Sequence, residues 1–376
     1  MQRLLNSAEN YVDEMLEGIY FAYPNQVTSV GNDLRCYVSK NVKPGKVGIV
    51  TGGGSGHLPL FLGYVGEGML DGCCIGGVFQ SPSADQILQT TAYVNQGAGV
   101  LYLFGNYSGD VMNFDMAAEM AQMEDINVMQ IAAGDDVASA AKENSEKRRG
   151  VAGIVFLYKI AGAAAEAMLP LEEVYRLTQK AAENTRSMGV ALSSCIIPEI
   201  GKPTFHMEDG SMEIGMGIHG ETGVRRGKLK AADEVTEELM DSILRDLPYQ
   251  DCDEVAVLVN GLGSTPREEL FIIYRKIVEI LKTRHIKIVH NYIGEFATSM
   301  EMAGVSISLL RLDEELKKYS KSWHRPAAFK DLDRYDNAEE EEDTKVRLLF
   351  EPRGAQIEAL CALENSRAEG ASRGIV

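Results

Sequence analysis

Positive charge is scarce in this sequence. Its 376 residues include 37 lysines and arginines against 55 aspartates and glutamates, a formal net charge of −18. Proteins that bind nucleic acids or anionic membranes need basic surfaces, so this balance argues against both classes. No apolar run approaches the roughly 20 residues that a membrane-spanning helix needs. We therefore expect neither a nucleic-acid-binding protein nor a membrane protein.

Cysteine is scarce as well, with six residues scattered along the chain. None has the spacing of a zinc site, and Cys73 and Cys74 are adjacent in an apolar segment. We therefore expect buried, reduced thiols, no bound metal and a cytoplasmic protein. Residues 4–20 carry acidic side chains on an amphipathic helical pattern, which predicts a helix and not a signal peptide.

A standard nucleotide-binding motif is also missing. Gly52 and Gly54 begin a G-x-G-x-x-G match, but the last position is His57, so the dinucleotide-binding fingerprint fails. The phosphate-binding signature G-x-x-x-x-G-K-[S/T] is absent, because no Gly-Lys pair is followed by Ser or Thr. The sequence therefore gives no sign that this chain itself binds a nucleotide.

Short apolar runs alternate with longer helical patterns, which is typical of the α/β class. The length is sufficient for two domains, and a boundary is expected near residues 185–189. We predict strands at 47–50, 72–75, 100–104, 128–131, 153–157, 189–196, 255–259, 286–289 and 305–310. We predict helices at 84–95, 111–121, 171–187, 232–246 and 266–282.

A single histidine, His219, stands among glycines in the segment Gly217-Ile218-His219-Gly220-Glu221. Glycine allows a sharp turn or the close approach of another group, so a small molecule could reach this imidazole. A nitrogen nucleophile held in this way can add to a ketone or an aldehyde. The alternative is a turn that contains an incidental histidine.

Two further segments place small polar residues directly after an apolar strand. The first is Thr51-Gly52-Gly53-Gly54-Ser55-Gly56-His57, and the second is Gly105-Asn106-Tyr107-Ser108-Gly109-Asp110. Loops of this kind form binding sites at the carboxyl edge of an open α/β sheet. Asp110 could accept a proton from a substrate hydroxyl, or it could cap a helix that begins near Val111.

Together these segments resemble the substrate-binding K subunit of dihydroxyacetone kinase, which is also found as the first domain of single-chain ketotriose kinases. The resemblance runs from the N-terminus to about Phe329, which is nearly the full length of the family's proteins. It rests on eight motifs in the family's order, at residues 52–57, 63–70, 81–85, 106–110, 148–153, 217–221, 260–265 and 298–304.

The resemblance implies a two-domain α/β fold with mixed β-sheets flanked by helices, over residues 1–185 and 186–329. It implies a phosphotransferase in which His219 forms a covalent hemiaminal with the ketone carbon of a small keto-sugar. His57 and Asp110 would then contact the hydroxyl that receives phosphate. The remaining substrate contacts are expected from the glycine-rich loops, at Gly53, Gly54, Ser55, Gly56 and Gly105.

The resemblance also implies partners. ATP or ADP with magnesium is expected on a separate nucleotide-binding kinase subunit that docks over the substrate site, and the K subunit is expected to be a homodimer. Residues 330–376 lie beyond the resemblance, and their acidic run followed by an apolar stripe predicts a linker and a C-terminal helix.

The sequence departs from the family pattern at three positions near the expected pocket. Leu58 and Gly77 stand where acids are expected, and Gly105 stands where many relatives carry lysine. These changes predict room for a ketose larger than dihydroxyacetone. They also fit a second function, a non-catalytic ketose sensor or co-activator that uses the same tether. A third function, an aldolase or isomerase, would need a Schiff-base lysine or a metal, to which the sequence does not point.

Overall fold

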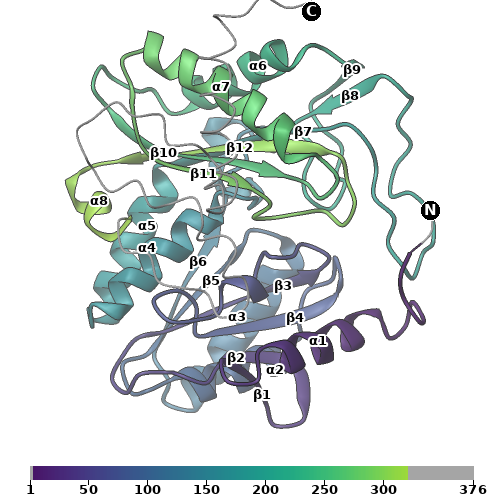
Figure 1. Ribbon diagram of the computed structural model, residues 1–376. Helices are drawn as coiled ribbons and strands as arrows, with labels where there is room; N and C mark the ends of the chain where they lie inside the picture. Colours follow the sequence, from purple (N-terminus) through teal and green to yellow (C-terminus); the bar gives the residue numbers. More distant parts are fainter. Residues whose placement is uncertain (1–2, 321–376) are drawn as a thin grey trace, which may run out of the picture. The chain divides into compact units, whose positions relative to one another are not determined.

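The computed structural model describes residues 3–320, so the linker and helix expected within 330–376 lie outside the described residues. The described part belongs to one compact unit and contains two six-stranded sheets with helices against them (Figure 1). This is the mixed α/β architecture that the sequence predicts. Within residues 3–320, no helix is both long enough and apolar enough to cross a membrane.

The first sheet has the order β1-β2-β4-β3-β5-β6. Its strands are β1 (Val27–Val30), β2 (Asp33–Ser39), β3 (Gly48–Ser55), β4 (Gly72–Val78), β5 (Val100–Gly105) and β6 (Val128–Ala133). The strand pairs β3–β4, β3–β5 and β5–β6 are parallel, whereas β2 is antiparallel to both β1 and β4. Parallel strands are covered on both faces, and β3 and β5 are accordingly buried along their whole length.

Alternate residues of β5 enter two different cores. Tyr102 and Phe104 pack with α2 (Ala84–Val94) and α3 (Ser108–Met123). Leu101 and Leu103 belong to the core that contains α4 (Ile154–Glu166) and α5 (Leu171–Glu183). The N-terminal helix α1 (Tyr11–Ala22) contacts β2. The period of two along each strand therefore directs one face to each helix layer.

The second sheet has the order β11-β10-β12-β7-β8-β9. Its strands are β7 (Thr185–Ala191), β8 (Ser211–Ile214), β9 (Arg225–Lys228), β10 (Glu254–Gly261), β11 (Lys287–Gly294) and β12 (Gly304–Leu312). Of its pairs, β10–β11 is parallel and the others are antiparallel. Helices α6 (Ala232–Asp246) and α7 (Arg267–Thr283) cover one face (Figure 1), and α8 (Glu314–Ser320) follows β12.

Helix α4 packs against both sheets. Its core contains residues of β3 and β5 from the first sheet and residues of β10, β11 and β12 from the second. The ring centroids of Phe156 on α4 and Tyr292 on β11 are 6.0 Å apart. All residues of α4 except its last are buried, which is why the segment has no polar face in the sequence.

Most of the predicted elements are confirmed, but two predictions are wrong. The strand predicted at 153–157 is the first part of α4, and the helix predicted to reach residue 187 ends at Glu183, before β7. The sequence did not predict β1, β2, β8, β9 or α8. Among the thiols, Cys252 is exposed, whereas Cys36, Cys73, Cys74 and Cys195 are buried and free as expected. The two-domain division stays a prediction.

Candidate active site

Strand β3 delivers His57 to the carboxyl edge of the first sheet. The end of the strand consists of glycines because there is no space for larger residues. A Cβ on Gly53 would lie 2.3 Å from the Phe61 ring, and one on Gly54 would lie 2.6 Å from the Phe79 backbone. Gly56 then adopts φ +98°, which favours glycine. His57 follows with 1% of its surface exposed.

The ring of His57 is held by the second half of the chain. Its Nδ1 lies 2.7 Å from the carbonyl oxygen of Thr298. Since a carbonyl oxygen accepts only, Nδ1 is the donor, and the neutral ring presents Nε2 as an acceptor. Burial, together with repulsion from His219, lowers the pKa of His57 to about 3. At neutral pH, His57 is therefore uncharged.

His219 meets His57 from a turn between β8 and β9. Gly220, at φ +79°, allows the turn. The Nε2 atoms of the two histidines lie 3.1 Å apart, although 162 positions separate them in the chain. The glycine-flanked histidine therefore lies against the loop that follows β3.

Glu221 binds His219 at two points. Its Oε2 accepts a hydrogen bond from the backbone N–H of His219 at 2.9 Å, and its Oε1 lies 3.3 Å from Nδ1 of the same residue. Burial by itself would raise the pKa of Glu221, but hydrogen bonding to His219 and the nearby Arg149 guanidinium hold it at about 2. Glu221 is therefore a carboxylate, which can only accept hydrogen bonds.

The protonation of the His219 ring follows from these contacts. Its Nδ1 faces the Glu221 carboxylate and its Nε2 faces the acceptor nitrogen of His57. Both neighbours accept, so both nitrogens of His219 must carry hydrogens for the two contacts to be hydrogen bonds. Hydrogen bonds at both nitrogens would make the ring an imidazolium with Glu221 as its counterion.

Asp110 lies in the first turn of α3 with 6% of its surface exposed. The residue at the N-cap is Tyr107, so Asp110 is not the helix cap that the sequence allowed. Its Oδ1 has no hydrogen-bond partner within the described part of the chain. Burial raises the pKa of Asp110 to about 6, against the opposing effects of a hydrogen bond from Ser81 and the charge of His219. Such a carboxylate is a stronger base than an ordinary aspartate.

These groups surround a small cavity of about 10 Å³, which is room for about one water molecule. Of the predicted site residues, Gly53, Gly54, Gly105, Asp110 and His219 line this cavity. His57 contacts the lining residue His219 but does not line the cavity itself. Ser55 and Gly56 do not line it. The other lining residues are Leu60, Phe61, Tyr107, Gly150, Val151, Ile154 and Ile218.

Two aromatic rings around His219 were not predicted as site residues. Phe79 stacks on His57 with ring centroids 4.7 Å apart, and it approaches His219 at 5.2 Å. Tyr107 lies edge-on to His219 at 4.5 Å, and its hydroxyl donates to the carbonyl of Gly150. Tyr107 belongs to a motif that the sequence analysis singled out, but nothing in the sequence distinguished the ring from its polar neighbours.

The room expected at the three departures is filled in this structure. A Cβ on Gly105 would lie 3.2 Å from the Tyr107 ring, and one on Gly77 would lie 2.7 Å from the side-chain oxygen of Gln80. Leu58 packs against the core that contains α4. Side chains of Tyr107 and Gln80 therefore lie close to the points where the missing side chains would begin.

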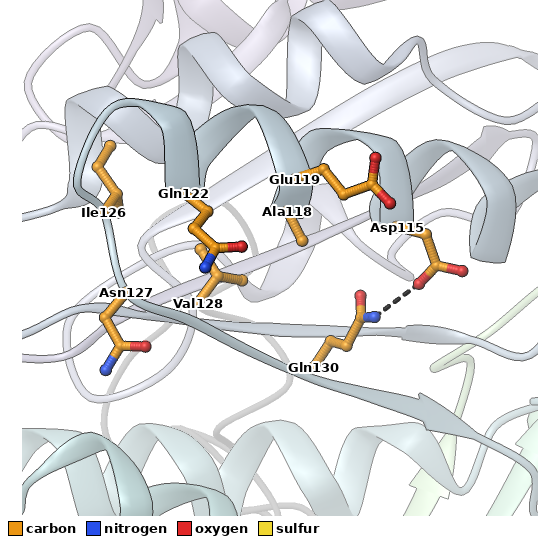
Figure 2. Close-up of a pocket in the computed structure, with 8 residues that line it drawn as sticks. All are labelled: Asp115, Ala118, Glu119, Gln122, Ile126, Asn127, Val128 and Gln130. Carbon is orange, nitrogen blue, oxygen red and sulfur yellow. Dashed lines mark hydrogen bonds between the residues drawn. The ribbon is translucent and has the colours of Figure 1, made fainter.

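A larger hollow lies elsewhere, between α3 and β6 (Figure 2). Its volume is about 380 Å³, and Gln130 donates a hydrogen bond of 2.6 Å to Asp115 across it. The hollow contains neither of the paired histidines nor any other predicted site residue, so size alone does not identify the reactive site. In the described part of the chain, no three His, Cys, Asp or Glu side chains are grouped so that they could hold a metal ion.

Comparison with protein families gives a match to the Dak1 domain over residues 17–328. The chain is 46% identical over 318 residues to the dihydroxyacetone-binding subunit DhaK of PTS-dependent dihydroxyacetone kinase 2 from Listeria innocua. That alignment covers 84% of this chain and 96% of the relative. The chain is 43% identical to L-erythrulose 1-kinase from Mycolicibacterium smegmatis, covering 85% of this chain and 56% of that protein.

A solved structure shares the fold. The dihydroxyacetone kinase operon co-activator DhaQ superimposes with a TM-score of 0.78 at 32% identity, covering 84% of this chain and 97% of the co-activator. One architecture is therefore shared by relatives named as kinase subunits and by a relative named as a co-activator.

Proposed function

Because this chain belongs to the Dak1 domain family, that of dihydroxyacetone kinase substrate-binding subunits, we propose that it holds a small keto-sugar covalently for phosphorylation. In this proposal the chain is a phosphotransferase subunit that presents a primary hydroxyl of the ketose to a phosphoryl donor. One observation carries the proposal: Nε2 of His219 lies 3.1 Å from His57, on the cavity that Asp110 also lines.

The first step is the tether. Nε2 of His219 would bond to the ketone carbon and form a hemiaminal, which fixes a small, flexible ligand in one orientation. Pre-paid orientation can lower a barrier by several kcal/mol, on the order of 7–11 in the best cases. A small polyol offers little surface for ordinary binding, so a covalent bond also selects carbonyl compounds. The glycines of β3 would allow the ligand to lie close to the backbone.

The second step is phosphoryl transfer. Asp110 would accept the proton of the attacking hydroxyl, because its buried carboxylate combines an unpartnered oxygen with a raised pKa. His57 would contact the same hydroxyl once the ketose separates it from His219. General-base help of this kind contributes about 10²–10⁴-fold to a rate.

The phosphoryl donor would come from a separate subunit. The chain covers nearly the whole length of a relative named as a subunit, but about half of L-erythrulose 1-kinase. It also lacks the nucleotide-binding motifs tested above. We therefore propose that ATP or ADP with magnesium belongs to a nucleotide-binding kinase partner, and that this chain acts as a cytoplasmic homodimer.

The substrate proposed is dihydroxyacetone or a larger ketose. The relatives are named for dihydroxyacetone and for L-erythrulose, and both names describe small ketones with primary hydroxyls. Purified chain should be combined with a cognate nucleotide-binding subunit and assayed against both ketoses. We expect phosphorylation of at least one, and its loss in His219→Ala. Turnover by His219→Ala at the parent rate would contradict the tether.

A second function, a ketose-binding co-activator, is favoured by the similarity to DhaQ. Such a protein would need the tether but not a general base. The retained Asp110, with its raised pKa, favours the enzyme. Tethering without turnover under any phosphoryl donor would support the co-activator instead.

A further inference from the structure

A row of charged groups runs from the paired histidines into the body of the protein. Glu221 contacts His219, and Nη1 of Arg149 lies 3.9 Å from Oε2 of Glu221. Arg149 is held in turn by Asp136, through contacts of 3.0 and 2.7 Å, and by the carbonyl oxygen of Gly215 at 3.0 Å. His219 is therefore connected to a fixed set of charges and not to solvent alone.

Gly217 makes this arrangement possible. A Cβ at this position would lie 2.3 Å from Oε2 of Glu221 and 2.7 Å from Nη1 of Arg149. Any other residue would push the carboxylate or the guanidinium away from the turn. The glycine before the histidine thus has a steric role that concerns the counterion, in addition to access for a ligand.

Glu221 is the anion in contact with the His219 ring. The other rings against it are His57, which is neutral at neutral pH, and the aromatic Phe79 and Tyr107. Asp110 lies on the same cavity, but its nearest described hydrogen-bond partner is Ser81. The charge of the imidazolium is therefore offset chiefly by Glu221.

We propose that Glu221 is a positioning residue for the covalent step: it keeps a hydrogen on Nδ1 of His219, directs Nε2 to the ketone, and offsets the charge of the ring before and after the bond forms. The covalent step rests on the proposed function. The effect of Glu221 on the protonation of the His219 ring does not depend on that function.

The atoms and charges of the step balance. The proton on Nε2 of His219 passes to the ketone oxygen, with Nε2 of His57 as its acceptor on the way. The Nε2 lone pair forms the bond to the carbonyl carbon, and the π pair of the carbonyl forms the new O–H bond. The ring begins as an imidazolium and ends as an Nε2-substituted imidazolium that still carries hydrogen on Nδ1. Its single positive charge is unchanged, so one ionised carboxylate matches both states.

Arg149 would keep that carboxylate ionised and oriented. Without a second cation nearby, a partly buried glutamate beside an imidazolium could take the Nδ1 proton, which would leave two neutral groups. The guanidinium favours the charged form of Glu221, and its own contacts to Asp136 and Gly215 fix its position. Arg149 thus acts through Glu221.

The test uses the full chain with ¹⁵N-labelled histidine and [2-¹³C]dihydroxyacetone. In the parent protein at neutral pH, both ring nitrogens of His219 should give the ¹⁵N shifts of protonated nitrogen, and the bound ¹³C signal should be that of a carbon with two heteroatoms. In Glu221→Gln, we expect the unliganded ring to lose one proton. The adduct should weaken about 10- to 100-fold, as for loss of a charge-assisted hydrogen bond. Glu221→Asp should recover part of this loss.

The control is Glu213→Gln. Glu213 accepts a hydrogen bond of 2.8 Å from Gly223 and pairs with Arg226, so it holds the same turn without touching the imidazole. This variant should keep both ring protons. An unchanged ring and adduct in Glu221→Gln, or an equal loss of ring protonation in Glu213→Gln, would overturn the proposal.

The experiment separates this inference from the proposed function. If the parent protein binds dihydroxyacetone without a new ¹³C signal, the tether fails, whatever Glu221 does. If the adduct forms equally in the parent and in Glu221→Gln, the tether stands and the role of Glu221 fails.

Discussion

Nε2 of His57 and Nε2 of His219 are 3.1 Å apart, and each ring is fixed on its other nitrogen, by the Thr298 carbonyl and by Glu221. A ketone that bonds to Nε2 of His219 must break this hydrogen bond and take its place. The two reactive nitrogens therefore face each other, which fits the small volume of the cavity.

The first prediction concerns His57. His57→Ala removes the acceptor that takes the Nε2 proton of His219, so formation of the adduct should slow by about 10²–10⁴-fold. The equilibrium fraction of adduct should change less than the rate. Exchange spectroscopy on [2-¹³C]dihydroxyacetone measures both quantities. An unchanged exchange rate would limit His57 to a packing role.

The second prediction concerns the pH dependence of turnover. The pKa of Asp110 is raised to about 6, so the carboxylate that accepts the hydroxyl proton is lost as the pH falls through this value. We expect kcat/KM of the reconstituted system to fall about tenfold for each pH unit below 6. Asp110→Asn should reduce kcat by about 10²–10⁴-fold and still tether the ketose. Parent-like turnover in this variant would show that Asp110 is not the base.

The third prediction is that the same substitution stabilises the protein. The raised pKa means that the folded state favours protonated Asp110, so its ionised form disfavours folding above pH 6. A neutral amide removes that cost, and Asp110→Asn should increase the free energy of unfolding by up to about 3 kcal/mol at pH 7.5. The gain should shrink as the pH is lowered through 6. Urea unfolding of both proteins at pH 7.5 and pH 5 measures it, and a loss of stability at pH 7.5 would contradict the assignment.

The fourth prediction concerns the size of the substrate. The uncharged side chains of Gln80 and Tyr107 lie close to Gly77 and Gly105, where charged side chains are missing. If Tyr107 swings aside, a fourth carbon and its hydroxyl can occupy the space. We expect kcat/KM to favour erythrulose over dihydroxyacetone by about tenfold, or about 1.4 kcal/mol. Gly105→Lys should narrow the preference. A clear preference of the parent protein for dihydroxyacetone would rule this out.

Much of the fold could be predicted because its strands are short apolar runs that end in glycine-rich loops. The exception at residues 153–157 has a physical cause: α4 is buried on all sides between the two sheets, so its sequence lacks the period that separates a helix from a buried strand. The ribbon of β8 and β9 was missed for the opposite reason, since β9 is the polar, mostly exposed segment Arg225–Lys228.

The part of the site that could be predicted is the part in which glycines flank the functional residues. The glycines beside His57 and His219 reflect close backbone packing, which leaves a clear mark in a sequence. Glu221 and Arg149 leave no such mark, because their role depends on a contact between residues 72 positions apart. Nothing in the sequence distinguishes Phe79 or Tyr107 from its neighbours, and only the folded chain brings both rings against His219.

A crystal structure of the chain with dihydroxyacetone or erythrulose would show directly whether His219 bonds to the ketone carbon. We expect continuous electron density between Nε2 of His219 and a tetrahedral carbon of the ligand, with His57 displaced from its 3.1 Å contact. A ketose held in the cavity with a planar carbonyl, separated from Nε2 by a van der Waals distance, would contradict it.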